Sequence, residues 1–265
     1  MIELLVVLFG LIFGSFLNVC IHRLPRDGSV VRPRSHCIHC GHQIDWYDNI
    51  PVAGFFLLGR SCRHCRASIS WRYTLVELLT AAFFLLIYAN WGLTPYAAKM
   101  ALFVTLLEGM VFSDWETRLL PDEFTLGGLA AGMALAWFIP VQNGMAGMFV
   151  DSEGMASVFD ASMGASFAAG ALWLVGYLFK MVRNLEGLGF GDVKMVAMMG
   201  AFLGLSSTLL AILLACVAGS AGGLAFILLM KKDSKYELPL GSFLGIAGIT
   251  VALWGSQILH WYTGL

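Results

Sequence analysis

Long, uninterrupted runs of apolar residues constrain this chain more than any other feature of its sequence. Each run approaches the ~20 residues that an α-helix needs to cross the ~30 Å hydrocarbon core of a bilayer. Only 12% of the 265 residues are charged, whereas soluble domains carry about 25%. Because such a chain cannot cover a surface in water with polar groups, we expect an all-α, polytopic membrane protein.

The apolar runs predict about eight transmembrane helices. They cover residues 2–20, 73–91, 97–114, 124–141, 157–182, 193–205, 207–230 and 240–262. The sixth run is the shortest and merges into the seventh around Ser206 and Ser207. The first run contains Glu3, has no basic residue before it and lacks a small-residue cleavage pattern. We therefore interpret it as an uncleaved helix and not as a signal peptide.

The basic residues predict the orientation of these helices. An outside N-terminus makes cytoplasmic the segments 21–72, 115–123, 183–192 and 231–239. Together these segments hold 13 of the 16 Lys and Arg residues. Positive charge gathers on the cytoplasmic side of membrane proteins, so we expect the N-terminus to lie outside.

Four of the six cysteines form two C-x2-C pairs in the segment 21–72, namely Cys37 with Cys40 and Cys62 with Cys65. Each pair turns two thiolates toward one point, and two pairs complete a tetrahedral zinc site. The segment has too few apolar residues to fold alone, so we expect a structural zinc ion in a small, zinc-ribbon-like domain. The alternatives are disulfides, redox-active thiols or no metal, although a reducing cytoplasm disfavours disulfides.

Two aspartates lie at helix ends on one side of the membrane. Asp114 ends the third predicted helix, and Asp192 closes Gly189-Phe190-Gly191-Asp192 before the sixth. Because two helices separate them, both belong to the face that carries the cysteine segment. Taken singly, Asp114 can be a solvated charge and Asp192 a helix N-cap, so their role stays open at this point. We interpret Asp122, which follows Pro121, as the N-cap of the fourth helix.

Taken together, the two carboxylates have the chemistry of amide hydrolysis. Two close carboxylates at a partly desolvated boundary cannot both ionise cheaply, so one keeps a proton. The ionised member can activate a water molecule, and the protonated member can protonate the leaving amine. Glu108 is deeper in the third helix, roughly 120° around it from Asp114. An intramembrane carboxylate is a functional candidate, and a buried structural pairing is the alternative.

The sequence resembles the bacterial type IV prepilin peptidases, which are membrane aspartic proteases of the Gly-x-Gly-Asp class. The resemblance rests on motifs that span most of the chain in order. These motifs are Gly14-Ser15-Phe16-Leu17-Asn18-Val19, Arg23-Leu24-Pro25, the two C-x2-C pairs, Trp71-Arg72-Tyr73, Leu75-Val76-Glu77, the stretch from Asp114 through Pro121-Asp122, and Gly189-Phe190-Gly191-Asp192-Val193-Lys194.

The resemblance implies removal of the basic leader from type IV prepilins and type II secretion pseudopilins, after a glycine. Asp114 and Asp192 match the two catalytic aspartates, at the cytoplasmic boundary of the bacterial inner membrane. It also implies N-methylation of the new N-terminal residue with S-adenosylmethionine, in a region comprising the cytoplasmic segment and Gly14 to Arg23. We expect pilin substrates and the lipid bilayer as partners, and no nucleic acid.

These observations predict three parts, namely a first transmembrane helix (1–20), a four-cysteine zinc-binding domain (21–72) and a transmembrane aspartic peptidase core (73–265). The alternative is a polytopic transporter or a redox membrane protein with a regulatory zinc domain. Transporters place polar residues near mid-bilayer, whereas the paired acids here lie at the boundary. The four-cysteine symmetry argues against a redox pair.

Overall fold

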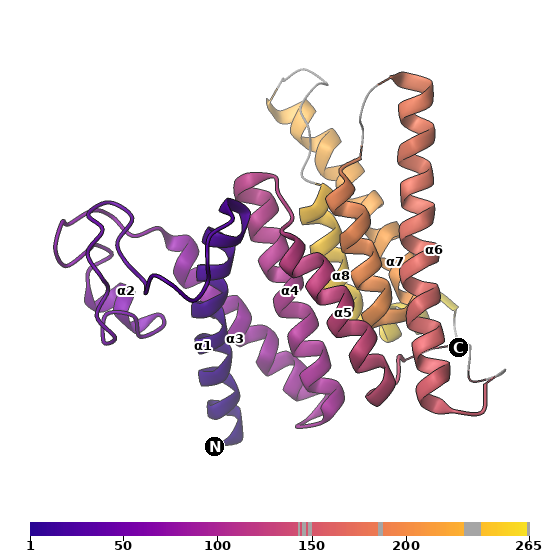
Figure 1. Cartoon of the computed structure of the whole chain (residues 1–265), viewed down its shortest axis with the longest axis horizontal. Coiled ribbons are helices and arrows are strands. Elements are labelled where there is room, and N and C mark those ends of the chain that lie inside the picture. The colour runs from indigo at the N-terminus through magenta and orange to yellow at the C-terminus, as the bar shows by residue number, and fades with distance from the viewer. Residues whose placement is uncertain (143, 145–146, 148–149, 185–187, 231–239, 264–265) are drawn as a thin grey trace. The chain divides into compact units, whose positions relative to one another are not determined.

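The computed structural model describes residues 1–142, 144, 147, 150–184, 188–230 and 240–263. Its secondary structure is helical, and the described residues form no β-strand beyond two isolated bridges. The chain divides into two compact units, Met1–Ala97 and Ala98–Leu265. Figure 1 shows the helices of each unit.

The first unit consists of two long helices and an irregular segment between them. Its elements are α1 (Ile2–Arg23), the 3-10 helix η1 (Leu24–Arg26), α2 (Ala53–Leu57) and α3 (Trp71–Trp91). Helices α1 and α3 pack closely because glycines of α1 face α3. A Cβ atom on Gly14 would lie 2.7 Å from the Cα of Glu77, and one on Gly10 would lie 2.5 Å from the Cα of Ala81. Small residues let helix backbones approach in this way within membranes.

The second unit is a helix bundle. Its elements are α4 (Pro95–Thr117, which begins at the boundary between the units), α5 (Asp122–Phe138), α6 (Glu153–Arg183), α7 (Phe190–Met230) and α8 (Leu240–Thr263). Large side chains of α4, α7 and α8 form its fully buried centre, including Leu107, Met199 and Leu253. The rings of Phe103 and Phe202 stack there with centroids 4.8 Å apart.

Helix α7 combines two predicted helices in one element. Its backbone leaves the helical conformation at Gly204, where φ is 75° and ψ is 179°. Glycine adopts this conformation without the steric cost that a Cβ atom brings. The break that the sequence predicts around Ser206 and Ser207 lies instead at Gly204, where two helical segments of α7 meet at a kink.

Six helices are long and apolar enough to cross a membrane, within the searched part of the chain. They are Ile2–Arg26, Trp71–Trp91, Pro95–Thr117, Glu153–Arg183, Phe190–Ala225 and Leu240–Tyr262. The predicted fourth span is also helical, but α5 has only 17 residues. All eight predicted segments are thus helical. The predicted cytoplasmic segment 231–239 lies outside the described residues.

The three predicted parts, 1–20, 21–72 and 73–265, divide the chain by function and remain a prediction. The two compact units divide the chain by packing. Helix α3, which belongs to the predicted 73–265 core, packs against α1 inside the first unit.

The contact between α6 and α7 yields a test of the fold. A Cβ atom on Gly164 would lie 2.7 Å from the carbonyl oxygen of Gly200 and from the carbonyl carbon of Gly204. We predict that Gly164→Leu lowers the free energy of unfolding by at least about 1–3 kcal/mol, because it overpacks this contact. Gly170→Leu on the same helix is the control, since nothing lies within 4 Å of its Cβ position. Thermal unfolding in detergent measures both, and equal stability of the two variants would contradict the packing.

Candidate active site and cysteine cluster

The two predicted aspartates lie together at the start of α8. A Cβ atom on Gly241 would lie 3.1 Å from Oδ1 of Asp192 and 3.2 Å from Oδ2 of Asp114. Both carboxyl groups therefore face one point beside the α8 backbone. Glycine leaves this point open, because a Cβ atom here would be in tight contact with both carboxylates.

Asp114 is held in the last turn of α4 by Ser242. Its Oδ2 atom accepts a hydrogen bond of 2.8 Å from the backbone N–H of Ser242 and one of 2.7 Å from the Ser242 hydroxyl. Both residues are buried. The N–H groups of a first helical turn have no partner within their own helix, so the start of α8 is a suitable donor for a carboxylate. Two donors on one oxygen fix the orientation of this carboxylate.

Asp192 lies within the first turn of α7, which begins at Phe190. It is therefore not the N-cap of this helix, and its backbone N–H donates to the carbonyl of Gly189 at 3.2 Å. The neighbouring glycines leave room at the site. A Cβ atom on Gly189 would lie 3.2 Å from Oδ2 of Asp192, and one on Gly191 would lie 3.2 Å from Leu120.

Asp122 does not have the role that the sequence predicts. Pro121 is the N-cap of α5, and no side chain caps this helix. The Asp122 carboxylate instead accepts a hydrogen bond of 2.6 Å from Nζ of Lys194. The N-cap interpretation is wrong because the helix begins at Asp122 itself, so Pro121 holds the cap position. Lys194 follows Asp192 by two residues, yet its side chain pairs with Asp122.

Sequence reasoning missed Gly241 and Ser242. The run Leu240-Gly241-Ser242 opens the last helix, yet nothing in its local pattern indicates contact with Asp114, which is far away in sequence. The structure also buries Glu108, with 2% of its surface exposed, deeper in α4 than Asp114.

The four predicted metal-ligating cysteines converge in the first unit. The sulfur atoms of Cys37, Cys40, Cys62 and Cys65 all lie within 4.8 Å of one another. The sulfurs of Cys37 and Cys65 are 3.8 Å apart, and four thiolates on a tetrahedral zinc ion are about 3.8 Å apart because each Zn–S bond is about 2.3 Å. The cysteines form no disulfide, so their arrangement fits a metal ion.

The two cysteine turns have the same backbone design. The N–H of Cys37 donates to the carbonyl of His42, and the N–H of Cys62 donates to that of Ala67. Gly41 and Arg66 follow the second cysteine of each turn and both have a positive φ. Backbone N–H groups of Cys65 and His64 donate hydrogen bonds to the sulfur of Cys62, and such bonds favour the thiolate that a metal requires.

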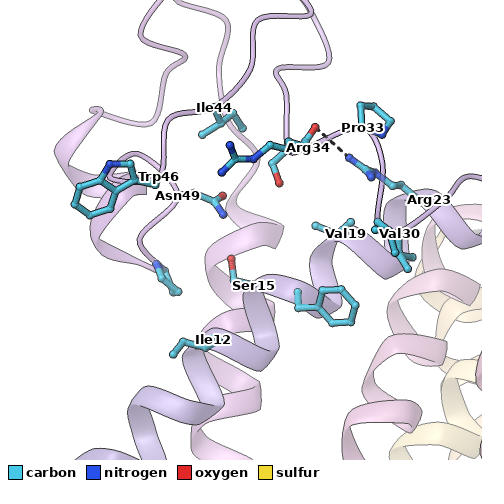
Figure 2. Close-up of a pocket in the computed structure, with 14 residues that line it drawn as sticks. Ile12, Ser15, Val19, Arg23, Val30, Pro33, Arg34, Ile44, Trp46 and Asn49 are labelled. Carbon is cyan, nitrogen blue, oxygen red and sulfur yellow. Dashed lines mark hydrogen bonds between the residues drawn. The ribbon is translucent and has the colours of Figure 1, made fainter.

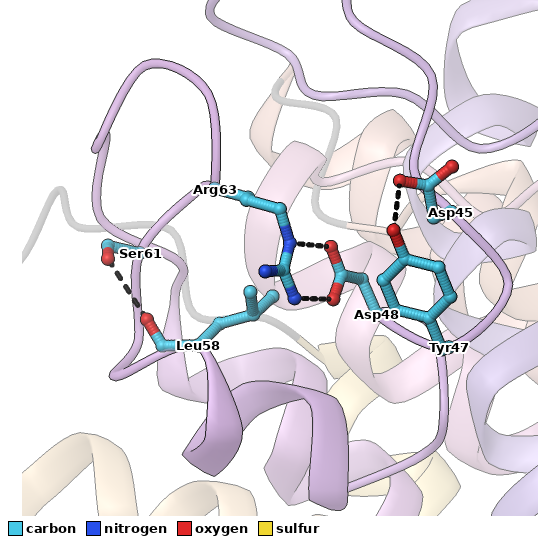
Figure 3. A network of polar contacts seen from close by, with 6 residues as sticks. All are labelled: Asp45, Tyr47, Asp48, Leu58, Ser61 and Arg63. Atoms are coloured by element: carbon cyan, nitrogen blue, oxygen red, sulfur yellow. Dashed lines mark hydrogen bonds and ion pairs between the residues drawn. The ribbon is translucent and has the colours of Figure 1, made fainter.

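An ion pair links the second cysteine turn to the rest of the segment. Figure 3 shows the Arg63 guanidinium facing the Asp48 carboxylate, with hydrogen bonds of 2.8 and 2.6 Å. These bonds hold the pKa of Asp48 below its usual value. The Tyr47 hydroxyl donates to Asp45 at 2.9 Å, and this bond raises the pKa of Tyr47. The segment is thus ordered by polar contacts.

A cavity of about 440 Å³ lies between α1 and this segment within the first unit. Figure 2 shows residues of both parts around it. Arg23 builds one wall by donating to the carbonyls of Ser29 at 2.8 Å and Arg34 at 3.4 Å. On α3, the buried Glu77 accepts a hydrogen bond of 2.7 Å from the backbone N–H of Val52, which ties the segment to this helix.

Fold and site together define a polytopic helical membrane protein with paired carboxylates at one end of a bundle. Two family profiles match the chain. The Bacterial Peptidase A24 N-terminal domain matches residues 8–91, and the Type IV leader peptidase family matches residues 100–224. The boundary between the two matches coincides with the boundary between the two structural units.

Curated relatives resemble the chain over nearly its whole length. The prepilin leader peptidase/N-methyltransferase of Pseudomonas aeruginosa is 36% identical, over 97% of this chain and 91% of its own. The protein of the same name from Aeromonas hydrophila is 36% identical, over 97% and 92%. No solved structure matches the chain significantly. The chain therefore belongs to the type IV leader peptidase family, as its sequence motifs indicate, and it is a multi-pass inner-membrane protein.

Proposed function

We propose that this protein is a membrane aspartic endopeptidase that removes the basic leader from type IV prepilins and type II secretion pseudopilins, after a glycine. The observation that carries the proposal is the convergence of Asp114 and Asp192 on one point beside Gly241. The prepilin leader peptidase names of the relatives support the substrate class.

The two aspartates divide the chemistry of amide hydrolysis. Asp114, with two hydrogen bonds on Oδ2, acts as the base and accepts a proton from the attacking water. Asp192 acts as the acid and donates a proton to the leaving amine. Such a pair titrates as a unit, so its two protonation steps belong to both residues together.

Ser242 is a positioning residue in this scheme. Its backbone N–H and hydroxyl fix one oxygen of Asp114 and thereby leave the other oxygen for water. The glycine before it keeps the shared space open for the scissile peptide. The start of α8 therefore orients the base without contacting the substrate through a side chain.

The proposed orientation places the N-terminus in the periplasm and the active site at the cytoplasmic boundary. It rests on the concentration of Lys and Arg in the segments 21–72, 115–123, 183–192 and 231–239. A prepilin leader is basic and stays on the cytoplasmic side for the same reason, so leader and catalytic pair meet at one face.

The cysteine cluster is proposed to hold a structural zinc ion. Its four thiolates satisfy a tetrahedral ion completely and leave no position for water. The surrounding segment contains few buried apolar residues, so a metal supplies the stability that a hydrophobic core cannot.

The N-methyltransferase names of the relatives further support methylation of the new N-terminus with S-adenosylmethionine as the donor.

The catalytic pair is tested by substitution. We predict that Asp114→Ala and Asp192→Ala each lower the rate of prepilin cleavage in membranes by about a hundred- to ten-thousandfold, because each removes one half of the acid–base pair. Asp122→Ala is the matched control and should cleave normally, since Asp122 pairs with Lys194. Full activity in either variant of the pair would remove that residue from the mechanism.

The role of Ser242 has its own signature. We predict that Ser242→Ala lowers kcat by about tenfold with little change in KM. The reason is that this variant loses the hydrogen bond by which the Ser242 hydroxyl orients the Asp114 carboxylate. Ser242→Thr keeps a hydroxyl and should restore most of kcat. Steady-state kinetics with a purified prepilin measures both variants, and an unchanged kcat in Ser242→Ala would refute the role.

Elemental analysis of the purified protein tests the metal site. We predict about one zinc ion per chain, lost when Cys37 and Cys62 are both replaced by serine, because two thiolates cannot complete the tetrahedron. Cys216→Ser, in α7, should keep its zinc. Metal-free protein with full cleavage activity would argue against the site.

A further inference from the structure

We propose that the cavity between α1 and the cysteine-containing segment binds S-adenosylmethionine, so that the methyl donor has a site of its own in the first unit. The inference rests on the proposed methyltransferase function and adds the location and the recognising residues. The catalytic aspartates belong to the second unit, so the two reactions use different residues.

Arg34 supplies the recognition of the donor's carboxylate. In Figure 2 its guanidinium points into the space between the segment and α1. Within the described residues, no hydrogen bond or ion pair occupies this guanidinium, and none of the residues that line the cavity is acidic. A guanidinium binds a carboxylate through two parallel hydrogen bonds, and S-adenosylmethionine carries one at its amino-acid end.

Arg23 gives this site its rigidity. Its guanidinium donates hydrogen bonds to the carbonyls of Ser29 and Arg34, so it holds in place the backbone that carries Arg34. The site therefore has one arginine that builds the wall and a second that is available to a ligand.

The remaining walls suit an adenosyl group. Trp46 presents an indole ring, with 76% of the residue exposed, and flat bases stack on aromatic rings. Asn49 offers an amide that can both donate and accept hydrogen bonds, as the edge of adenine requires. Ile12 and Phe16 of α1 add an apolar wall. The volume of about 440 Å³ falls within the roughly 300–1,000 Å³ of small-molecule sites.

The position of the cavity fits the acceptor as well. Its apolar wall belongs to the membrane-spanning α1, and its polar wall belongs to the segment outside the membrane. A cleaved pilin has a free N-terminal amine at the end of a hydrophobic helix, so its amine reaches the same boundary. When bound, the donor supplies a methyl group to the amine lone pair, the carbon–sulfur bond electrons stay on sulfur, and the ammonium releases its proton to water.

Equilibrium binding of labelled S-adenosylmethionine to the purified full chain in detergent tests the proposal. We expect Arg34→Gln to weaken binding about ten- to a hundredfold, because it removes a charged hydrogen-bonding partner. Trp46→Ala should weaken binding about tenfold through lost stacking, whereas Trp46→Phe should retain most of the affinity. Arg32→Gln is the matched control, since Arg32 is exposed in the same segment but does not line the cavity.

Prepilin cleavage and zinc content are measured on the same samples and should stay at wild-type levels. If Arg34→Gln lowers prepilin cleavage or zinc content, Trp46→Ala, which changes an exposed residue, tests the location of the site instead. Wild-type affinity in these variants would overturn the location and leave the proposed methylation intact. A wild-type chain that cleaves prepilin but binds no S-adenosylmethionine would overturn the donor itself. Retention of a phospholipid that Arg34→Gln releases, with unchanged S-adenosylmethionine binding, would assign the cavity to lipid instead.

Discussion

The contact between the start of α8 and the end of α4 is the interaction on which the catalytic site depends. Ser242 donates two hydrogen bonds to Asp114 from positions that a helix cannot satisfy internally. Gly241 lets the two carboxylates approach the same backbone. The first turn of α8 thus replaces the water that would otherwise solvate Asp114, and it does so with dipoles that are already oriented before substrate binds.

The two structural units divide the proposed work between them. The second unit has a tightly packed, apolar centre, with small residues where α6 meets α7. The first unit stabilises its irregular segment differently, through the cysteine cluster, the Arg63–Asp48 pair and the bond from Val52 to Glu77. The proposed ligand-binding segment and the proposed peptidase pair therefore belong to parts of the chain that are stabilised in different ways.

The helical segments, the pairing of Asp114 with Asp192 and the convergence of the four cysteines could all be predicted from local signals. Apolar runs report helices through the thickness of the bilayer, and an even number of helices between two residues returns the chain to one side. The C-x2-C spacing reports a metal site through the geometry of a turn. The sequence does not place the kink of α7 correctly, because nothing local distinguishes Gly204, whose backbone leaves the helix, from the many other glycines.

The sequence by itself determined the class of this protein, its membrane-spanning segments and the residues proposed for peptidase and metal chemistry, because these follow from composition and short spacing. Only the tertiary structure decided that Ser242 holds Asp114, that Asp122 pairs with Lys194, and that Arg34 faces a cavity. Each of these depends on a contact between residues far apart or on where a side chain points. No local pattern encodes such contacts, because they arise only when helices pack.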